Sequence, residues 1–502
     1  MNYGSDPDSV AIAGPGEPLS YRELTTAVDA LAAAFQSLDP APGSRVGICA
    51  RNTVEHLLAL LATYAAGKVW VPLNPTNSRA DLDRMIAATR PTLLVADASC
   101  LDRFSPTEAP LVLGKVAGAP TASPNVRSLV AEWRGRTPAQ VDRAEGDPQI
   151  IKFSGGSTGM PKPVVQSRRC VDAQIRGILA CFELDATDVN LIAAPLTHGA
   201  SCFVLPVLAV GGRHVLVEDP KPPNVLDAIE TYGVTTMYAP PTLIYGMLGD
   251  ESASRRRYAT LRHVIYSAAP MRPDQIREAQ RVFGPVIEAA YGQVEAPQIV
   301  TAMRAAELTR DENLESIGRP SPVAEVAIMG PDGELLPNGR GEIGEIVVRG
   351  PLVMNGYLDR PDMTASAFTN GWLRTGDLGL IDDRGYVYIR GRLREVINSG
   401  GFKVFPGDVE AALAKHPAVA ECSVFGAPDE KWGEAVHAAV RLVPGVVVNA
   451  AELIGFVKSE LGSVKAPKTI HFVAELPRNA AGKVSRAAVR DLVVGSDGNT
   501  ST

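Results

Sequence analysis

The first stretch of this sequence whose residue types could do chemistry is residues 152–162, KFSGGSTGMPK. Its glycines let the backbone curl so that several N–H groups face one point, and the hydroxyls of Ser154, Ser157 and Thr158 add donors around that point. Lys162 closes the stretch with a positive charge. Such a loop suits phosphate binding, although the common GxxxxGK[ST] spacing is absent. A flexible surface loop is the alternative for this stretch taken alone.

Four further motifs follow in chain order: YGQVEAP at 291–297, WLRTGDLG at 372–379, IRGRLREVINSGG at 389–401 and PRNAAGK at 477–483. Together the five motifs resemble the superfamily of acyl- and aryl-CoA synthetases, nonribosomal peptide adenylation domains and firefly luciferase. That family's motifs read roughly [ST]SG[ST]TGxPKG, YGxTE, TGD, GRxxD and PxxxxGK. The resemblance covers nearly the whole chain. It implies a ligase that uses ATP to activate a carboxylic acid as an acyl-adenylate, releases pyrophosphate, and passes the acyl group to a nucleophile.

The resemblance implies a nucleotide site built from several segments. Glu295 would bind Mg²⁺, a hard cation that prefers carboxylate and phosphate oxygens. Asp377 would accept hydrogen bonds from both ribose hydroxyls, and Arg392 would donate to the same sugar; a helix-capping or turn role is the alternative for Asp377. The implied phosphate residues are Ser154, Gly155, Gly156, Ser157, Thr158, Gly159 and Lys162, and those near the adenine are Ser267, Ala268, Ala269, Pro270, Tyr291, Gly292 and Gln293.

The resemblance also assigns two catalytic residues. Lys483 would stabilise the negative charge that develops when the carboxylate attacks the α-phosphorus; a solvated loop lysine is the alternative. His198, in APLTHGAS, would gate the acid pocket, although a lone histidine also serves structural roles. Small residues around it suggest a slot for a wide, flat aromatic or heteroaromatic acid, or simply tight packing: Gly199, Ala200, Ser201, Cys202, Ala289 and Ala290.

Three positions depart from the family pattern. Pro163 stands where glycine is usual, and Val294 stands where YGxTE has threonine. The hinge position, about which the C-terminal domain would rotate between the two half-reactions, is Arg394 instead of the usual Asp or Lys. These departures suggest a specialised branch of the superfamily. With the overall likeness, they favour amide bond synthetases, which transfer the acyl group to an amine; transfer to the thiol of coenzyme A is the alternative, and a catalytically silent nucleotide-binding protein is a third.

The elements that must position these residues alternate between strand-like and helix-like segments over the first two-thirds of the chain. Strands are expected at 46–49, 70–73, 93–96, 235–239, 264–266 and 286–289, with helices at 54–65, 79–88, 225–232 and 273–282. This alternation predicts an α/β fold with largely parallel sheets covered by helices. Hairpin signals from about residue 323 predict a small β subdomain at 323–391. We expect an N-terminal domain over 1–391 and a mobile α+β domain over 392–502 carrying Lys483.

Length and composition are consistent with this prediction. A chain of 502 residues is too long for one ordinary core. Its formal charge of -7 argues against a nucleic-acid-binding protein, which would need a basic face. No apolar stretch approaches the length of a membrane span, and no signal peptide is visible. The six cysteines show no CxxC pairs, which argues against zinc and disulfide frameworks and favours a cytoplasmic setting. The sequence leaves the oligomeric state and the identity of the acid undetermined.

Overall fold

The structure of the chain is a computed structural model that describes residues 6–14, 16–104, 111–113, 125–154, 161–478 and 484–494. Its contacts divide the chain into two compact units. One unit comprises Met1–Val326 and Val348–Leu373, and the other Ala327–Val347 and Arg374–Thr502. This division does not test the domain boundary that the sequence predicted at residue 392, which stays a prediction.

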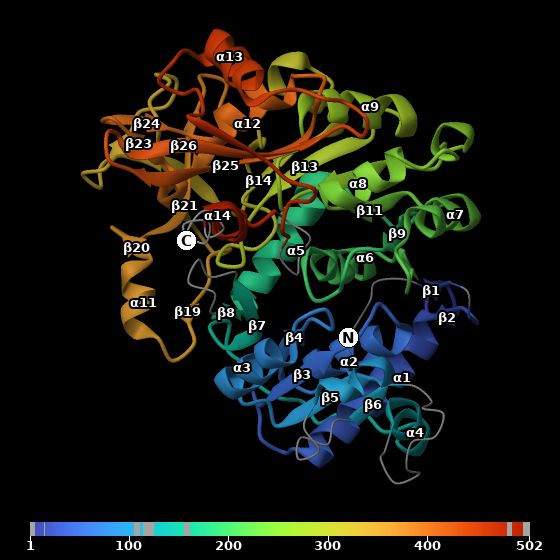
Figure 1. Cartoon of the computed structure of the whole chain (residues 1–502). Helices are drawn as coiled ribbons and strands as arrows, with labels where there is room; N and C mark the ends of the chain where they lie inside the picture. Colours follow the sequence, from blue (N-terminus) through green and yellow to red (C-terminus); the bar gives the residue numbers. More distant parts are fainter. Residues whose placement is uncertain are drawn as a thin grey trace. The chain divides into compact units, whose positions relative to one another are not determined.

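The first unit contains a seven-stranded sheet in the order β19-β8-β7-β4-β3-β5-β6. The pairings among β3 to β7 are parallel, whereas β8 and β19 are added antiparallel. The strands are β3 (Arg45–Cys49), β4 (Val69–Leu73), β5 (Leu93–Asp97), β6 (Leu111–Leu113), β7 (Pro148–Ser154), β8 (Lys162–Ser167) and β19 (Gly356–Tyr357). Helices α2 (Val54–Ala65) and α3 (Arg79–Thr89) lie between successive parallel strands, as the alternation predicted (Figure 1).

A nine-stranded sheet in the same unit has the order β15-β14-β13-β12-β11-β9-β10-β1-β2. The strands from β13 to β1 in this order run parallel. The strands are β1 (Val10–Ala13), β2 (Leu19–Ser20), β9 (Val189–Ile192), β10 (Arg213–Leu216), β11 (Thr236–Tyr238), β12 (His263–Tyr266), β13 (Ile287–Tyr291), β14 (Thr301–Met303) and β15 (Arg319–Pro320). The predicted α/β class with largely parallel sheets is thus confirmed.

Local sequence explains where the helices of this unit begin. Ser20 starts α1 (Tyr21–Leu38) with a capping box, in which its hydroxyl accepts from the Glu23 N–H and its own N–H donates to the Glu23 carboxylate. Ser167 caps α5 (Arg168–Phe182) in the same position. The other α-helices are α4 (Val126–Glu132), α6 (Val204–Ala209), α7 (Pro222–Tyr232), α8 (Pro241–Leu248), α9 (Pro273–Phe283), α10 (Ala305–Leu308) and α11 (Pro361–Ser366).

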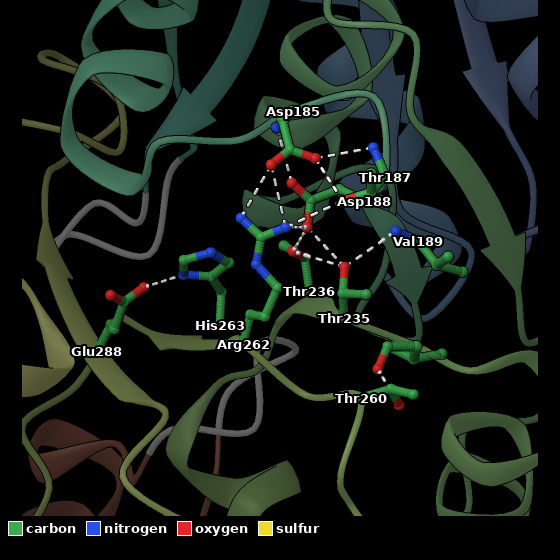
Figure 2. Close-up of polar contacts among 11 residues, drawn as sticks. Asp185, Thr187, Asp188, Val189, Thr235, Thr236, Thr260, Arg262, His263 and Glu288 are labelled. Atoms are coloured by element: carbon green, nitrogen blue, oxygen red, sulfur yellow. Dashed lines mark hydrogen bonds and ion pairs between the residues drawn. The ribbon is translucent and has the colours of Figure 1, made fainter.

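A polar network ties together the amino ends of the parallel strands (Figure 2). The fully buried carboxylate of Asp188 accepts hydrogen bonds from the hydroxyls of Thr235, at 2.6 Å, and Thr236, at 2.8 Å. One strand further along the sheet, His263 Nδ1 lies 2.9 Å from a carboxylate oxygen of Glu288. These groups lie just before or at the start of β9, β11, β12 and β13, so they brace the edge opposite to the carboxyl ends of the strands.

A sheet of short hairpins follows in the order β17-β16-β18-β21-β20, with β22 paired to β21. Its strands are β16 (Glu325–Met329), β17 (Leu335–Leu336), β18 (Gly344–Arg349), β20 (Phe368–Thr369), β21 (Trp372–Ile381) and β22 (Val387–Arg392). The β16–β17 turn has Gly333 at φ 84°, a left-handed conformation that glycine adopts at little cost. The predicted hairpin-rich character of this region is confirmed.

The end of the chain forms an α+β module around a five-stranded sheet, β24-β23-β26-β25 with β27 paired to β26. Buried apolar residues such as Val424, Val436, Leu413 and Leu453 pack its helices on the sheet. The elements are β23 (Ile397–Ser399), β24 (Phe402–Val404), α12 (Pro406–Ala414), β25 (Val419–Asp429), β26 (Gly433–Leu442), α13 (Ala450–Leu461), β27 (Thr469–Phe472) and α14 (Arg486–Val494). Among the helices in the described residues, none is long and apolar enough to cross a membrane.

Candidate active site

The ends of the predicted phosphate loop lie on neighbouring strands. Ser154, the last residue of β7, and Lys162, the first of β8, are directly paired in an antiparallel register. The loop therefore leaves and re-enters the sheet at one point. Its predicted phosphate ligands Gly155, Gly156, Ser157, Thr158 and Gly159 lie outside the described residues.

Tyr357 connects Lys162 with the predicted metal ligand. The Nζ of Lys162 lies 5.8 Å from the centroid of the Tyr357 ring. The Tyr357 hydroxyl donates a 3.0 Å hydrogen bond to Oε1 of Glu295. Burial and the charge of Glu295 raise the pKa of Tyr357, so the phenol stays protonated and able to donate. Successive contacts thereby link the cation of Lys162, the ring of Tyr357 and the carboxylate of Glu295 at the start of β8.

Sequence patterns did not single out Tyr357 as a site residue. It belongs to the two-residue strand β19, which pairs with β8 through Tyr357 and Val164. A strand this short has no periodicity to detect. The only local hint is the preceding Asn355-Gly356, a turn dipeptide.

The predicted adenine residues lie at the carboxyl ends of two neighbouring parallel strands. Ser267 directly follows β12, and Tyr291 is the last residue of β13. Ligands of open α/β sheets bind at this edge. Ala268 has φ 77°, an uncommon conformation for a residue with a Cβ, and such strain gathers at functional sites.

Gly292 has a steric reason to be glycine. A Cβ at this position would come within 2.4 Å of the backbone nitrogen of Gln298. The next residue, Gln293, donates its N–H to the Ala296 carbonyl at 2.9 Å, and its side-chain amide lies 3.4 Å from the Tyr291 hydroxyl. The loop after β13 is therefore a tight turn that brings Glu295 back toward the strand end.

His198 lies in the turn between β9 and the 3₁₀ helix η2 (Gly199–Phe203). Its side chain is exposed, and Nδ1 lies 2.9 Å from the Thr197 hydroxyl. Its carbonyl accepts hydrogen bonds from Ser201 Oγ at 2.8 Å and from Lys152 Nζ at 3.2 Å. The turn is thus anchored through its backbone, while the imidazole faces outward.

The residues predicted to form an acid pocket divide into separate environments. Ser201 and Cys202 line a small cavity together with Lys152. Ala289 and Ala290 are buried in β13. Gly199 is small for a packing reason, since a Cβ there would come within 2.5 Å of the Tyr238 ring.

The second unit carries the predicted ribose residues. Asp377 on β21 and Arg392 on β22 are cross-strand partners, and Arg392 Nε lies 2.7 Å from Asp377 Oδ1. Asp377 is only 2% exposed, whereas the Arg392 side chain is 43% exposed. Asp377 lies within a strand and so caps no helix. The pair presents one buried acceptor and one accessible donor.

The predicted hinge and catalytic lysine belong to the same unit. Arg394 lies in the exposed 3₁₀ turn η5 (Leu393–Glu395). Lys483 lies outside the described residues, but Arg478 before it and Val484 after it form an antiparallel bridge. Arg486 then anchors the start of α14 through Glu410, at 2.6 Å, and through Glu395.

Family models identify the class of protein that this arrangement defines. The model for AMP-binding enzymes matches residues 2–358, and the model for the AMP-binding enzyme C-terminal domain matches residues 408–483. The chain belongs to the AMP-binding enzyme family and is an adenylate-forming ligase.

Individual relatives differ in their acyl acceptor. The medium/long-chain-fatty-acid–CoA ligase FadD8 of Mycobacterium tuberculosis is 34% identical, covering 94% of this chain and 85% of the relative. Feruloyl-CoA synthase of an Amycolatopsis species is 31% identical, covering 96% of each chain. Among solved structures, the amide bond synthetase McbA from Marinactinospora thermotolerans matches with a TM-score of 0.86 at 30% identity, covering 96% of this chain and 97% of McbA. ATP-bound MatB from Rhodopseudomonas palustris matches with a TM-score of 0.88 at 29% identity, covering 97% and 96%.

Proposed function

We propose that this ligase activates an aromatic or heteroaromatic carboxylic acid as an acyl-adenylate and transfers the acyl group to an amine. The observation that carries the adenylation half is the chain of contacts from Lys162 through Tyr357 to Glu295 at the ends of the phosphate loop. ATP binding needs a cation for phosphate and an oxygen ligand for its metal, and these contacts bring both to the start of β8.

The residues fit a magnesium ion held mainly by ATP. No group of three or more His, Cys, Asp or Glu side chains in the described part of the chain could hold a metal alone. Mg²⁺ commonly takes one or two carboxylates and completes its shell with phosphate oxygens and water. Glu295, held by the Tyr357 hydroxyl through one oxygen, would supply the protein ligand, and the ion would neutralise charge on the phosphates.

The roles of the remaining residues follow from their chemistry. Ser267 to Pro270, with Tyr291 to Gln293, would bind the adenine, and Asp377 with Arg392 would bind the ribose. Lys483 would stabilise charge at the α-phosphate while the acid attacks. Rotation about Arg394 would then withdraw Lys483 and admit the acceptor, a hinge motion of the kind that gates two-step enzymes.

If the acceptor is an amine, we expect His198 to accept the proton that the amine must lose. An amine attacks only as the free base, and alkylamines are mostly protonated at neutral pH because their pKa lies near ~10.4. A neutral imidazole can accept a proton on one ring nitrogen, and the residue His198 is exposed at this turn. The likeness to McbA over nearly the full length supports this acceptor.

Coenzyme A is the second candidate acceptor, and a surface feature of the C-terminal unit favours it. The Nζ atoms of Lys431 and Lys468 lie 4.9 Å and 5.5 Å from the centroid of the Trp432 ring. The nearby β23–β24 hairpin exposes 59% of Phe402. Exposed aromatic rings beside cations suit an adenine nucleotide. The curated relatives that are CoA ligases point the same way.

One experiment separates the two acceptors. The enzyme is incubated with ATP, Mg²⁺ and an acid panel, with an amine, with coenzyme A, or with both, and the products are identified by mass spectrometry. Amide formed equally well without coenzyme A supports the proposal. Thioester as the dominant product in competition, with no amide when coenzyme A is omitted, identifies an acyl-CoA synthetase instead.

A further inference from the structure

Lys152 is a buried cation that adenylation as described above does not use. It lies on β7, two residues before the phosphate loop, and is only 8% exposed. Its Nζ donates to the His198 carbonyl at 3.2 Å and to Ser201 Oγ at 3.0 Å. The same atom lies 5.4 Å from the centroid of the Trp70 ring. An ammonium group has three donors, so these two oxygens leave one for another acceptor.

A second buried lysine has a carboxylate partner, which Lys152 lacks among the described residues. Lys68 is 1% exposed and pairs with the carboxylate of Asp39 at 3.5 Å. Within the described ranges, no carboxylate forms an ion pair with Lys152, whose oxygen partners are a carbonyl and a hydroxyl. A buried charge without a counter-ion is costly. An anion that enters the site would therefore be bound strongly.

Lys152 lines a cavity that can receive such a group. The cavity has a volume of about 10 Å³, room for one water-sized group, and its polar lining comprises Lys152, Ser201, Gln174 and Tyr64. A larger cavity of about 370 Å³ adjoins it, and the two share Tyr64, Val171, Ile175 and Leu205. Lys152 thus lines the small cavity, while residues of α2 and α5 line the larger one beside it.

The small cavity adjoins the His198 turn, because Lys152 and Ser201 line it and both donate to the His198 carbonyl. The proposed function puts the acid at this turn. We propose that Lys152 and Ser201 bind a second anionic oxygen of the substrate, remote from the carboxylate that is activated. The substrate class is then an aromatic acid that carries a further carboxylate or phenolate. This inference rests on the proposed function, since it assumes that an acid is adenylated near His198.

The test compares matched acids in pyrophosphate release. An aromatic dicarboxylic acid and its half-amide have nearly the same shape but differ in the second negative charge. We expect wild type to prefer the diacid in kcat/KM by about 10- to 100-fold, the range of a buried charge-assisted hydrogen bond. Lys152→Met should remove this preference, because it should lower kcat/KM for the diacid at least tenfold more than kcat/KM for the half-amide.

Controls separate specificity from folding. Lys68→Met removes the other buried lysine, so it should lower the thermal unfolding temperature without changing the diacid preference. If Lys152→Met does not fold, Lys152→Gln replaces it in the comparison. The preference of wild type for the diacid over the half-amide also tests the inference without any variant. Equal use of the two acids by wild type, or an unchanged preference in the Lys152 variant, overturns the inference while adenylation stands. Absence of pyrophosphate with every acid would contradict the proposed function instead.

Discussion

The carboxylate of Asp377 lies 2.7 Å from the guanidinium of Arg392, across the pairing of β21 with β22. The carboxylate is buried and the guanidinium is partly accessible. Because the two residues hold each other, the pair is already oriented before a sugar arrives. A ribose would find an acceptor and a donor in fixed positions, which reduces the entropy lost on binding.

Asp377→Ala should raise the apparent KM for ATP by about 10- to 100-fold, because a ribose would lose a charge-assisted hydrogen bond worth roughly 1.5–3 kcal/mol. Steady-state kinetics with varied ATP measures this change. Asp188→Asn is the matched control, since Asp188 is also buried and hydrogen-bonded but lies at the amino ends of the strands. It should lower the unfolding temperature and leave the KM for ATP unchanged. Equal effects of both variants on KM would contradict the ribose role.

Glu295→Gln should shift the Mg²⁺ concentration needed for half-maximal adenylation upward, because an amide is a weaker ligand for a hard cation than a carboxylate. Tyr357→Phe removes only the 3.0 Å hydrogen bond to Glu295 and keeps the ring beside Lys162. It should therefore cause a smaller shift in the same direction. The measurement is pyrophosphate release during Mg²⁺ titration. Superimposable titrations of wild type and Glu295→Gln would remove Glu295 as a metal ligand.

Acidification should destabilise the fold through its buried histidines. Burial lowers the pKa of His214 to about 4 and that of His56 to about 4. In the neutral ring of His214, Nε2–H donates to the Val204 carbonyl and Nδ1 accepts from the Asn190 amide. The unfolded chain takes up these protons near pH ~6.5. The stability that the neutral rings contribute to the folded state is therefore fully present above that pH and is lost as the pH falls toward 4.

Thermal unfolding between pH 4 and 7 tests this dependence. Between pH 7 and pH 4, we expect the free energy of unfolding of His214→Gln to fall by up to about 3 kcal/mol less than that of wild type. His56→Gln should do the same independently, because the two rings lie in different parts of the first unit. A slope identical to wild type in both variants would contradict the assignment.

The yield of amide should rise from pH 6 to 9, because the fraction of free amine increases as the pH approaches its pKa near ~10.4. His198→Ala should depress transfer to the amine more than formation of the adenylate. Single-turnover assays that follow pyrophosphate and amide separately measure the two steps. Equal loss in both steps would assign His198 to binding of the acid, with no part in proton transfer.

The sequence predicted the parts of this protein that depend on local pattern. Alternating segments predicted the parallel sheets, and the Asp332-Gly333 signal predicted the β16–β17 hairpin. The sequence did not predict contacts between segments that lie far apart along the chain. The pairing of Tyr357 with β8 rests on a strand of two residues, and the burial of Lys152 depends on a helix and a turn far along the chain. The smallness of Gly199 left a flat substrate slot and tight packing open, and only the structure shows that the Tyr238 ring lies against this glycine.

The most direct test of the two-step account is Lys483→Ala assayed in each half-reaction separately. The first assay is acid-dependent pyrophosphate release from ATP, and the second is acyl transfer from a supplied acyl-adenylate to an amine. Charge builds up at the α-phosphate only in the first step. We therefore predict that the variant loses pyrophosphate release while transfer from the supplied adenylate proceeds at nearly the wild-type rate. An equal fall in both half-reactions would contradict the assignment of Lys483 to adenylation.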